Sequence, residues 1–218
     1  MKEGKIKTIL MDCDGVLVDS EVVYLTSLVN YLKTLGVDTT VEEMTCLVGS
    51  DIESITEKIQ NEFGLAHYSA SELIKGQREQ FAKEFSPEML QEMPGLTRFV
   101  ETMNREEMEL AVVSSSTNVY VEQIVKRLGL EPYFKIILGR ESAKRAKPAP
   151  DLYQKALEIL GADPDTTIVI EDSKNGILAG KAAGCKVIAY CGSKIKQDIS
   201  QADWKVDDYQ EAADLILG

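Results

Sequence analysis

The sequence predicts an α/β protein in which a parallel sheet is interrupted, after its first strand, by an all-helical insertion. Two observations predict this class. From residue 94 onward, short apolar runs alternate with amphipathic helical patterns, which is typical of parallel strands joined by crossover helices. Between residues 20 and 90 the apolar spacing is helical and no strand pattern occurs. We expect an α/β core domain formed by residues 1–19 and 93–218 and a four-helix cap domain formed by residues 20–92.

The opening segment, residues 6–12, is expected to be a buried strand because apolar residues dominate it. Four helices should follow, at about residues 21–35, 41–47, 51–63 and 71–85. The last three helices each begin with a capping box, in which a hydroxyl and a carboxyl satisfy free amides at a helix start. These boxes pair Thr40 with Glu43, Ser50 with Glu53 and Ser69 with Glu72.

The remaining elements alternate. Strands are expected at residues 109–113, 135–138, 167–170 and 187–190, and helices at about residues 96–107, 118–128, 151–160, 175–183 and 208–216. The first strand must join the same sheet, since alone it would leave backbone groups unpaired. The result is a doubly wound, Rossmann-like sheet with hinges to the cap at residues 18–20 and 91–95.

Composition limits the class of partner. The chain of 218 residues is 44% hydrophobic, which is enough to bury a core, and its net charge is −12. That charge argues against nucleic acid, because phosphate backbones are bound by clustered lysine and arginine. The sequence shows no membrane-length apolar stretch and no hydrophobic signal region. We expect a cytoplasmic monomer that binds neither nucleic acid nor a membrane.

Polar side chains follow four of the expected strands. Asp12 and Asp14 close the first strand, and their i, i+2 spacing turns both carboxylates to one side. In an open parallel sheet, ligands bind at the carboxyl ends of the strands. The other strand ends carry hydroxyls, a cation and two carboxylates: Ser114, Ser115, Ser116 and Asn118, then Lys147, then Glu171 and Asp172.

Each of these groups has a simpler interpretation on its own. A strand-end aspartate is often a turn residue, a run of serines often caps a helix, and a lysine before a proline is often a solvated loop residue. Their joint placement favours a site. Four converging carboxylates would repel one another without a counter-ion, and a set of oxygen ligands suits Mg²⁺.

These motifs resemble those of the haloacid dehalogenase superfamily of phosphatases and phosphomutases. The resemblance rests on residues 12–21 (DCDGVLVDSE), the strand ending at Ser114, residues 147–151 (KPAPD) and residues 171–177 (EDSKNGI). The motifs occur in the family's order across essentially the whole chain. The helical insertion is similar to the small cap of the β-phosphoglucomutase-like branch.

The resemblance implies a role for each residue. Asp12 would be the nucleophile that forms an aspartyl-phosphate, and Asp14 would be the general acid and then the base. Ser114 and Lys147 would hold the transferring phosphoryl group. The implied Mg²⁺ ligands are Asp12, Asp14 through its carbonyl, and Asp172, with Glu171 beside or behind them. The implied contacts of the substrate phosphate are Gly15, Ser115, Ser116 and Asn118.

The expected activity is Mg²⁺-dependent hydrolysis of a small phosphomonoester metabolite, such as a sugar phosphate. The alternative is a phosphomutase of the β-phosphoglucomutase type, whose pattern includes extra cations for a second phosphate. This sequence instead has Tyr24 and Thr117 near two of those positions and no arginine in residues 49–52, which favours the phosphatase. A more distant alternative is a signalling receiver with a phosphorylated aspartate, which needs neither the insertion nor Asp14.

Overall fold

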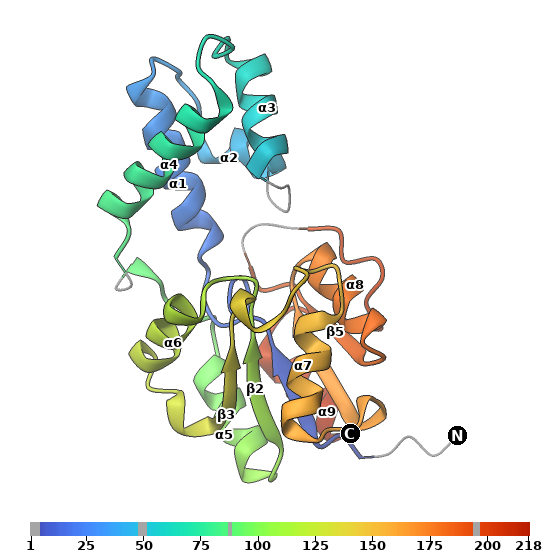
Figure 1. The fold of residues 1–218 in the computed structure, drawn as a ribbon. Coiled ribbons are helices and arrows are strands. Elements are labelled where there is room, and N and C mark those ends of the chain that lie inside the picture. The colour runs from blue at the N-terminus through green and yellow to red at the C-terminus, as the bar shows by residue number, and fades with distance from the viewer. Residues whose placement is uncertain (1–4, 48–51, 87–88, 194–196) are drawn as a thin grey trace. The chain divides into compact units, whose positions relative to one another are not determined.

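The computed structural model describes residues 5–47, 52–86, 89–193 and 197–218 (Figure 1). The chain divides into two compact units, residues 1–19 with 91–218 and residues 20–90. We call the first the sheet unit and the second the helical unit. No helix in the described ranges is long and apolar enough to cross a membrane.

Over the part of the chain that the structure describes, the sheet unit is built on six strands in the order β3-β2-β1-β4-β5-β6. Their bounds are β1 Thr8–Met11, β2 Glu109–Val113, β3 Phe134–Leu138, β4 Thr167–Glu171, β5 Lys186–Tyr190 and β6 Trp204–Val206. All neighbouring strands pair in parallel, which confirms the predicted doubly wound sheet. The strand order reverses beside β1, so the carboxyl end of β1 is where such a sheet binds ligands.

Helices cover both faces of this sheet. They are α5 Leu96–Arg105, α6 Asn118–Arg127, α7 Asp151–Leu160, α8 Lys174–Ala182 and α9 Tyr209–Leu217. On one face, α7 and α8 pack over a buried cluster that includes Leu10, Val113 and Val169. On the other face, α5 contacts β2, and α9 contacts both α5 and β6. The strand ends are thus held by a core on each side of the sheet.

The helical unit contains α1 Glu21–Thr34, α2 Val41–Met44, α3 Ile52–Glu62 and α4 Ala70–Glu84. α1 and α4 pack against each other, and both Leu28 of α1 and Leu73 of α4 are buried. The capping boxes predicted at Thr40 and Ser69 are confirmed. The box predicted at Ser50 lies outside the described residues. Within the described residues, four α-helices therefore form the insertion, as the sequence predicts.

Among the strands and α-helices described, two differ clearly from the sequence prediction. β6 has no predicted counterpart, because its three residues are too few for an alternation to be recognised. The helix expected over residues 41–47 ends at Met44 and continues as a 3-10 turn, Thr45–Leu47. Neither difference involves the carboxyl ends of β1, β2 and β4.

The two segments that lead from the sheet unit to the helical unit are paired with each other. Val18 forms an antiparallel bridge with Glu92, and the Met93 N–H donates to the Leu17 carbonyl at 2.8 Å. This pairing lies within the sheet unit. It gives the insertion a defined point of departure directly after the first motif.

Candidate active site

Three buried carboxylates meet at the carboxyl ends of β1 and β4. Asp12 follows β1 directly, and its backbone N–H donates to the Ile170 carbonyl at 3.0 Å. Glu171 ends β4 and Asp172 comes next. One ligand oxygen from each of Asp12, Glu171 and Asp172 lies within 4.8 Å of the other two. Within the described ranges, this is the one group of acidic, histidine and cysteine side chains with a spacing that suits a metal ion.

Lys147 lies among these carboxylates. Its ammonium group donates to Asp12 Oδ1 at 2.6 Å, to Glu171 Oε1 at 2.7 Å and to the Val113 carbonyl at 2.9 Å. These bonds use all three of its donors, and the side chain is only 4% exposed. Lys147 therefore places one positive charge between two carboxyl groups. A further acceptor could bond to the ammonium group only by replacing one of these three.

Glu171 is held at both of its oxygens. Oε1 accepts from Lys147 and, at 3.0 Å, from the Tyr153 hydroxyl. Oε2 accepts from the backbone N–H groups of Asp172 and Ser173 and from the Ser173 hydroxyl. These contacts fix the Glu171 carboxylate, which in turn fixes Lys147.

Two glycines let the backbone pass close to the carboxylates. Gly15 has a φ of +76°, and a Cβ added there would lie 1.8 Å from Asp172 Oδ2. A Cβ added at Gly176 would lie 1.7 Å from Glu171 Oε1. The sequence predicts Gly15 as a phosphate contact, and the structure gives it a steric role: no larger residue fits the turn after β1 beside Asp172.

Asp14 has different partners from Asp12. Its Oδ2 accepts from the Ser116 hydroxyl at 2.7 Å, and its Oδ1 accepts from the Tyr120 hydroxyl at 2.9 Å. The Asp14 carboxylate is not a member of the acidic cluster. Its predicted part in metal binding is through the backbone carbonyl, which is a separate group. The two aspartates of the first motif thus present one carboxylate beside an ammonium and one between two hydroxyls.

The hydroxyl and amide groups after β2 do not all face the cluster. Ser114 is buried, and its Oγ accepts from the Ser116 N–H at 3.0 Å. Ser115 is exposed. Asn118 is directed to the loop after β3, where its Oδ1 accepts from the Gly139 N–H. The structure therefore brings Ser114 and Ser116 to the strand ends and engages Asn118 elsewhere.

Two tyrosines that the sequence analysis does not single out contact the predicted site residues. Tyr120 lies in the first turn of α6 and donates to Asp14. Tyr153 lies in the first turn of α7, is fully buried and donates to Glu171. A buried tyrosine hydroxyl usually has a hydrogen-bond partner. From the sequence, this rule could have predicted that the Tyr153 hydroxyl bonds to a polar group, but not that the group is Glu171.

Burial dominates the electrostatics of the cluster. It raises the pKa of the Asp12 carboxyl to about 8, against the attraction of Lys147. Burial alone would lower the pKa of the Lys147 ammonium, but the charges of Asp12 and Glu171 hold it well above its usual value. Without a metal ion, the Asp12 carboxyl therefore retains its proton at neutral pH. A divalent cation fits these residues, because it would replace that proton and supply the missing positive charge.

We expect the affinity of the protein for a divalent cation to rise with pH up to about pH 8. The raised pKa of Asp12 means that at lower pH the cation must displace a proton. Its dissociation constant should therefore fall about tenfold per pH unit between roughly pH 6 and pH 7.5. Calorimetric titration with magnesium chloride, in buffers of different ionisation enthalpy, measures the affinity and counts the released protons. An affinity that is constant over this range would contradict the expectation.

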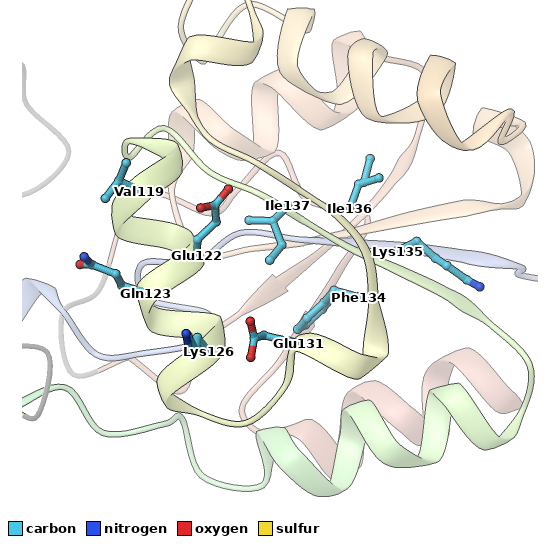
Figure 2. Close-up of a pocket in the computed structure, with 9 residues that line it drawn as sticks. All are labelled: Val119, Glu122, Gln123, Lys126, Glu131, Phe134, Lys135, Ile136 and Ile137. Carbon is cyan, nitrogen blue, oxygen red and sulfur yellow. The ribbon is translucent and has the colours of Figure 1, made fainter.

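A separate hollow of about 630 Å³ lies between α6 and β3, at the edge of the sheet (Figure 2). Val119 and Lys126 of α6 line it, together with Phe134 and Ile137 of β3. None of the predicted site residues is among its lining residues. The acidic cluster is thus a different place from this hollow.

The chain is similar to proteins of one hydrolase family. The family described as haloacid dehalogenase-like hydrolase matches residues 9–190. The bifunctional riboflavin kinase/FMN phosphatase of Arabidopsis thaliana is 30% identical over 185 residues, which are 83% of this chain and 47% of that protein. This chain thus spans about half the length of that relative.

Other relatives match over most of their length. The phosphorylated carbohydrates phosphatase of Thermotoga maritima is 28% identical over 187 residues, which are 84% of each chain. A solved structure of a conserved haloacid dehalogenase-like protein of unknown function from Agrobacterium tumefaciens is 26% identical. The match covers 97% of this chain and 98% of that chain, with a TM-score of 0.83.

Proposed function

This chain belongs to the haloacid dehalogenase-like hydrolases, and we propose that it is a Mg²⁺-dependent phosphatase that acts on a small phosphomonoester through an aspartyl-phosphate. One observation carries the proposal: Asp12 stands buried at the end of β1, bonded to Lys147 and grouped with two further carboxylates. Two relatives are named as phosphatases, one of FMN and one of phosphorylated carbohydrates. These names support a small phosphorylated metabolite as the substrate.

The donor set of the cluster suits Mg²⁺. The three side chains offer only carboxylate oxygens, which hard divalent cations prefer. We propose Asp12 and Asp172 as side-chain ligands, with the Asp14 carbonyl beside them. Glu171 would stand behind, because both of its oxygens already accept hydrogen bonds from the protein. When bound, Mg²⁺ would offset the repulsion between Asp12 and an anionic phosphate.

In the first half-reaction, the phosphoryl group moves to the protein. An oxygen of Asp12 forms a bond to phosphorus while the bond from phosphorus to the substrate oxygen breaks. The leaving oxygen keeps the electron pair and receives a proton from Asp14. Lys147 remains beside Asp12 and offsets negative charge there, and the Ser114 hydroxyl is proposed to donate to the phosphoryl oxygens.

In the second half-reaction, water releases the phosphate. Asp14 has lost its proton and accepts one from a water molecule, whose oxygen attacks phosphorus. The bond between phosphorus and Asp12 breaks, and the electron pair returns to the carboxylate. Inorganic phosphate leaves, and both carboxyl groups have regained their starting forms.

The other predicted contacts are proposed in two groups. Gly15 and Ser115 would meet the substrate phosphate at the strand ends. Ser116 and Asn118 have side chains that already bond to Asp14 and to the Gly139 N–H. We propose that these two residues hold the active-site loops in place and do not contact the phosphate.

Hydrolysis is favoured over a mutase reaction by Thr117. The resemblance expects a cation here for a second phosphate, whereas the Thr117 side chain accepts from the Tyr120 N–H and caps α6. Of the other two positions compared, Tyr24 lies in α1 and supplies no cation, and residues 49–51 lie outside the described residues. Membership of a hydrolase family also argues against the signalling receiver.

We expect the purified protein to release inorganic phosphate from at least one member of a panel of sugar phosphates and FMN. EDTA should abolish the activity and added Mg²⁺ should restore it, because the buried carboxylates need a cation before an anion can approach. A hexose 1-phosphate with Mg²⁺ and a bisphosphate primer tests the mutase alternative, which would yield the 6-phosphate in place of free phosphate. If the protein released phosphate from no member of the panel, the proposed function would be contradicted.

A further inference from the structure

We infer that Tyr120 is a positioning residue for the general acid, Asp14, and acts through its hydroxyl. The inference rests on the proposed function, because it concerns the proton that Asp14 gives to the leaving oxygen. Tyr120 lies outside the sequence motifs on which the family resemblance rests. The structure places it at the acid by direct contact.

Both oxygens of the Asp14 carboxylate accept hydrogen bonds from residues in one stretch of chain. The Ser116 hydroxyl donates to Oδ2 at 2.7 Å and the Tyr120 hydroxyl donates to Oδ1 at 2.9 Å. Thr117 lies between these two residues and caps α6 by accepting from the Tyr120 N–H. The start of α6 therefore fixes both donors relative to each other, and together they fix the plane of the carboxylate.

Hydroxyl groups suit a residue that must be both acid and base. A hydroxyl can donate to an ionised carboxylate and can turn to accept from a protonated carboxyl. A lysine or arginine could do only the first. Tyr120 and Ser116 can thus hold Asp14 at the same place before and after the proton has left. Proton transfer depends on such placement, because the acid must lie within hydrogen-bond reach of the leaving oxygen.

This role has a kinetic signature that depends on the leaving group. A sugar phosphate leaves as an alkoxide and needs the proton from Asp14, whereas p-nitrophenyl phosphate leaves as a phenolate that is stable without one. The ratio kcat/KM reports the steps up to formation of the aspartyl-phosphate. Poor placement of Asp14 should therefore lower kcat/KM for the sugar phosphate and spare it for p-nitrophenyl phosphate.

The test compares Tyr120→Phe with the wild-type enzyme on p-nitrophenyl phosphate and on the sugar phosphate that the wild type hydrolyses fastest. We expect kcat/KM for the sugar phosphate to fall about tenfold to a hundredfold, the range for a hydrogen bond to a charged group. For p-nitrophenyl phosphate, kcat and KM should fall together, so that kcat/KM stays within about twofold of the wild-type value. The matched control is Tyr133→Phe. The Tyr133 hydroxyl donates to Glu101 at 3.4 Å at the protein surface, so its loss should leave kcat/KM unchanged for both substrates.

The outcomes separate this inference from the function on which it rests. A wild-type enzyme without phosphatase activity overturns the proposed function and this inference with it. Equal losses of kcat/KM on both substrates, or no loss on the sugar phosphate, overturn the role of Tyr120 alone. The thermal midpoint of each variant shows whether folding is intact. Tyr120→Leu also lacks the hydroxyl, and we expect the same selective loss of kcat/KM on the sugar phosphate. A loss seen in Tyr120→Phe but not in Tyr120→Leu would come from the phenylalanine ring and not from the missing hydroxyl.

Discussion

An Asp12→Asn enzyme should fold as the wild type does and lose its phosphatase activity, by roughly ten-thousandfold or more. The substitution exchanges one carboxylate oxygen for an amide, so it removes the proposed nucleophile with almost no change of volume. Its amide oxygen can still accept the hydrogen bond that Lys147 donates to Asp12 Oδ1. Chemistry should therefore fail while packing survives.

Folding should be preserved for an electrostatic reason as well. Burial raises the pKa of Asp12 to about 8, so the cation-free protein carries a neutral carboxyl there at pH 7. A neutral amide resembles that form. We expect the thermal midpoint of Asp12→Asn to match the wild type near pH 7 in EDTA, and to fall behind it when Mg²⁺ is added, because the variant has lost a metal ligand.

Three measurements check the prediction. Phosphate release gives the loss of turnover, and acid-quenched protein from a reaction with radiolabelled substrate shows whether a phosphoenzyme forms. Asp14→Asn is the informative companion, since it should still form the phosphoenzyme from p-nitrophenyl phosphate and then hydrolyse it slowly. Asp198→Asn, on an exposed carboxylate paired with Lys174 at 3.3 Å, is the surface control. Substantial Mg²⁺-dependent turnover by Asp12→Asn would exclude Asp12 as the nucleophile.

The position of residues along the strands could be predicted from the sequence. Asp12, Ser114 and Glu171 stand at or next to the ends of buried apolar runs, and a parallel sheet must bring such ends to one edge. The capping boxes are also local patterns, since their donors and acceptors lie three residues apart. The sheet and its carboxyl edge therefore follow from signals only a few residues long.

The direction of side chains on the helices could not be predicted in the same way. Tyr120 reaches Asp14 and Tyr153 reaches Glu171 because of how α6 and α7 are rotated about their axes above the sheet. Asn118, one residue from the cap of α6, is turned to Gly139 for the same reason. Periodicity indicates which face of a helix is buried, but contact with one particular carboxylate depends on the path of the whole chain.

Lys147→Met should lower the free energy of unfolding of the cation-free protein by about 3–5 kcal/mol at pH 8, the cost of leaving buried charges without their partner. Lys147 is the cation that Asp12 and Glu171 share, and its side chain is 4% exposed. Methionine keeps much of the packing of the lysine stem and removes the charge together with the three hydrogen bonds of the ammonium group. The loss is a large part of the total stability of a typical domain, about 5–15 kcal/mol.

The loss should grow further above about pH 8, and the direction of this growth follows from Asp12. Burial already raises the folded-state pKa of Asp12 above its unfolded value, and removal of the Lys147 charge would raise it further. A group with a raised folded pKa contributes stability at low pH that is lost as the pH rises through that pKa. The part of the gap that comes from Asp12 should therefore be small below about pH 7 and should widen as the pH rises through about 8, where the wild type ionises Asp12 beside Lys147 and the variant does not. Urea unfolding in EDTA at several pH values measures this gap.

Two further variants separate charge from packing. Lys155→Met removes an exposed lysine of α7 that pairs with Glu158, and it should change stability by no more than about 0.5 kcal/mol. Adding Glu171→Gln to Lys147→Met should recover part of the loss, because it removes one of the charges that the lysine balances. A glutamine oxygen can accept the bonds now made to Oε2, and its amide can face the Tyr153 hydroxyl oxygen. If the gap between Lys147→Met and the wild type shrank as the pH rose, or if the double variant were less stable than the single one, Lys147 would be acting through its packing and not as the counter-ion of the cluster.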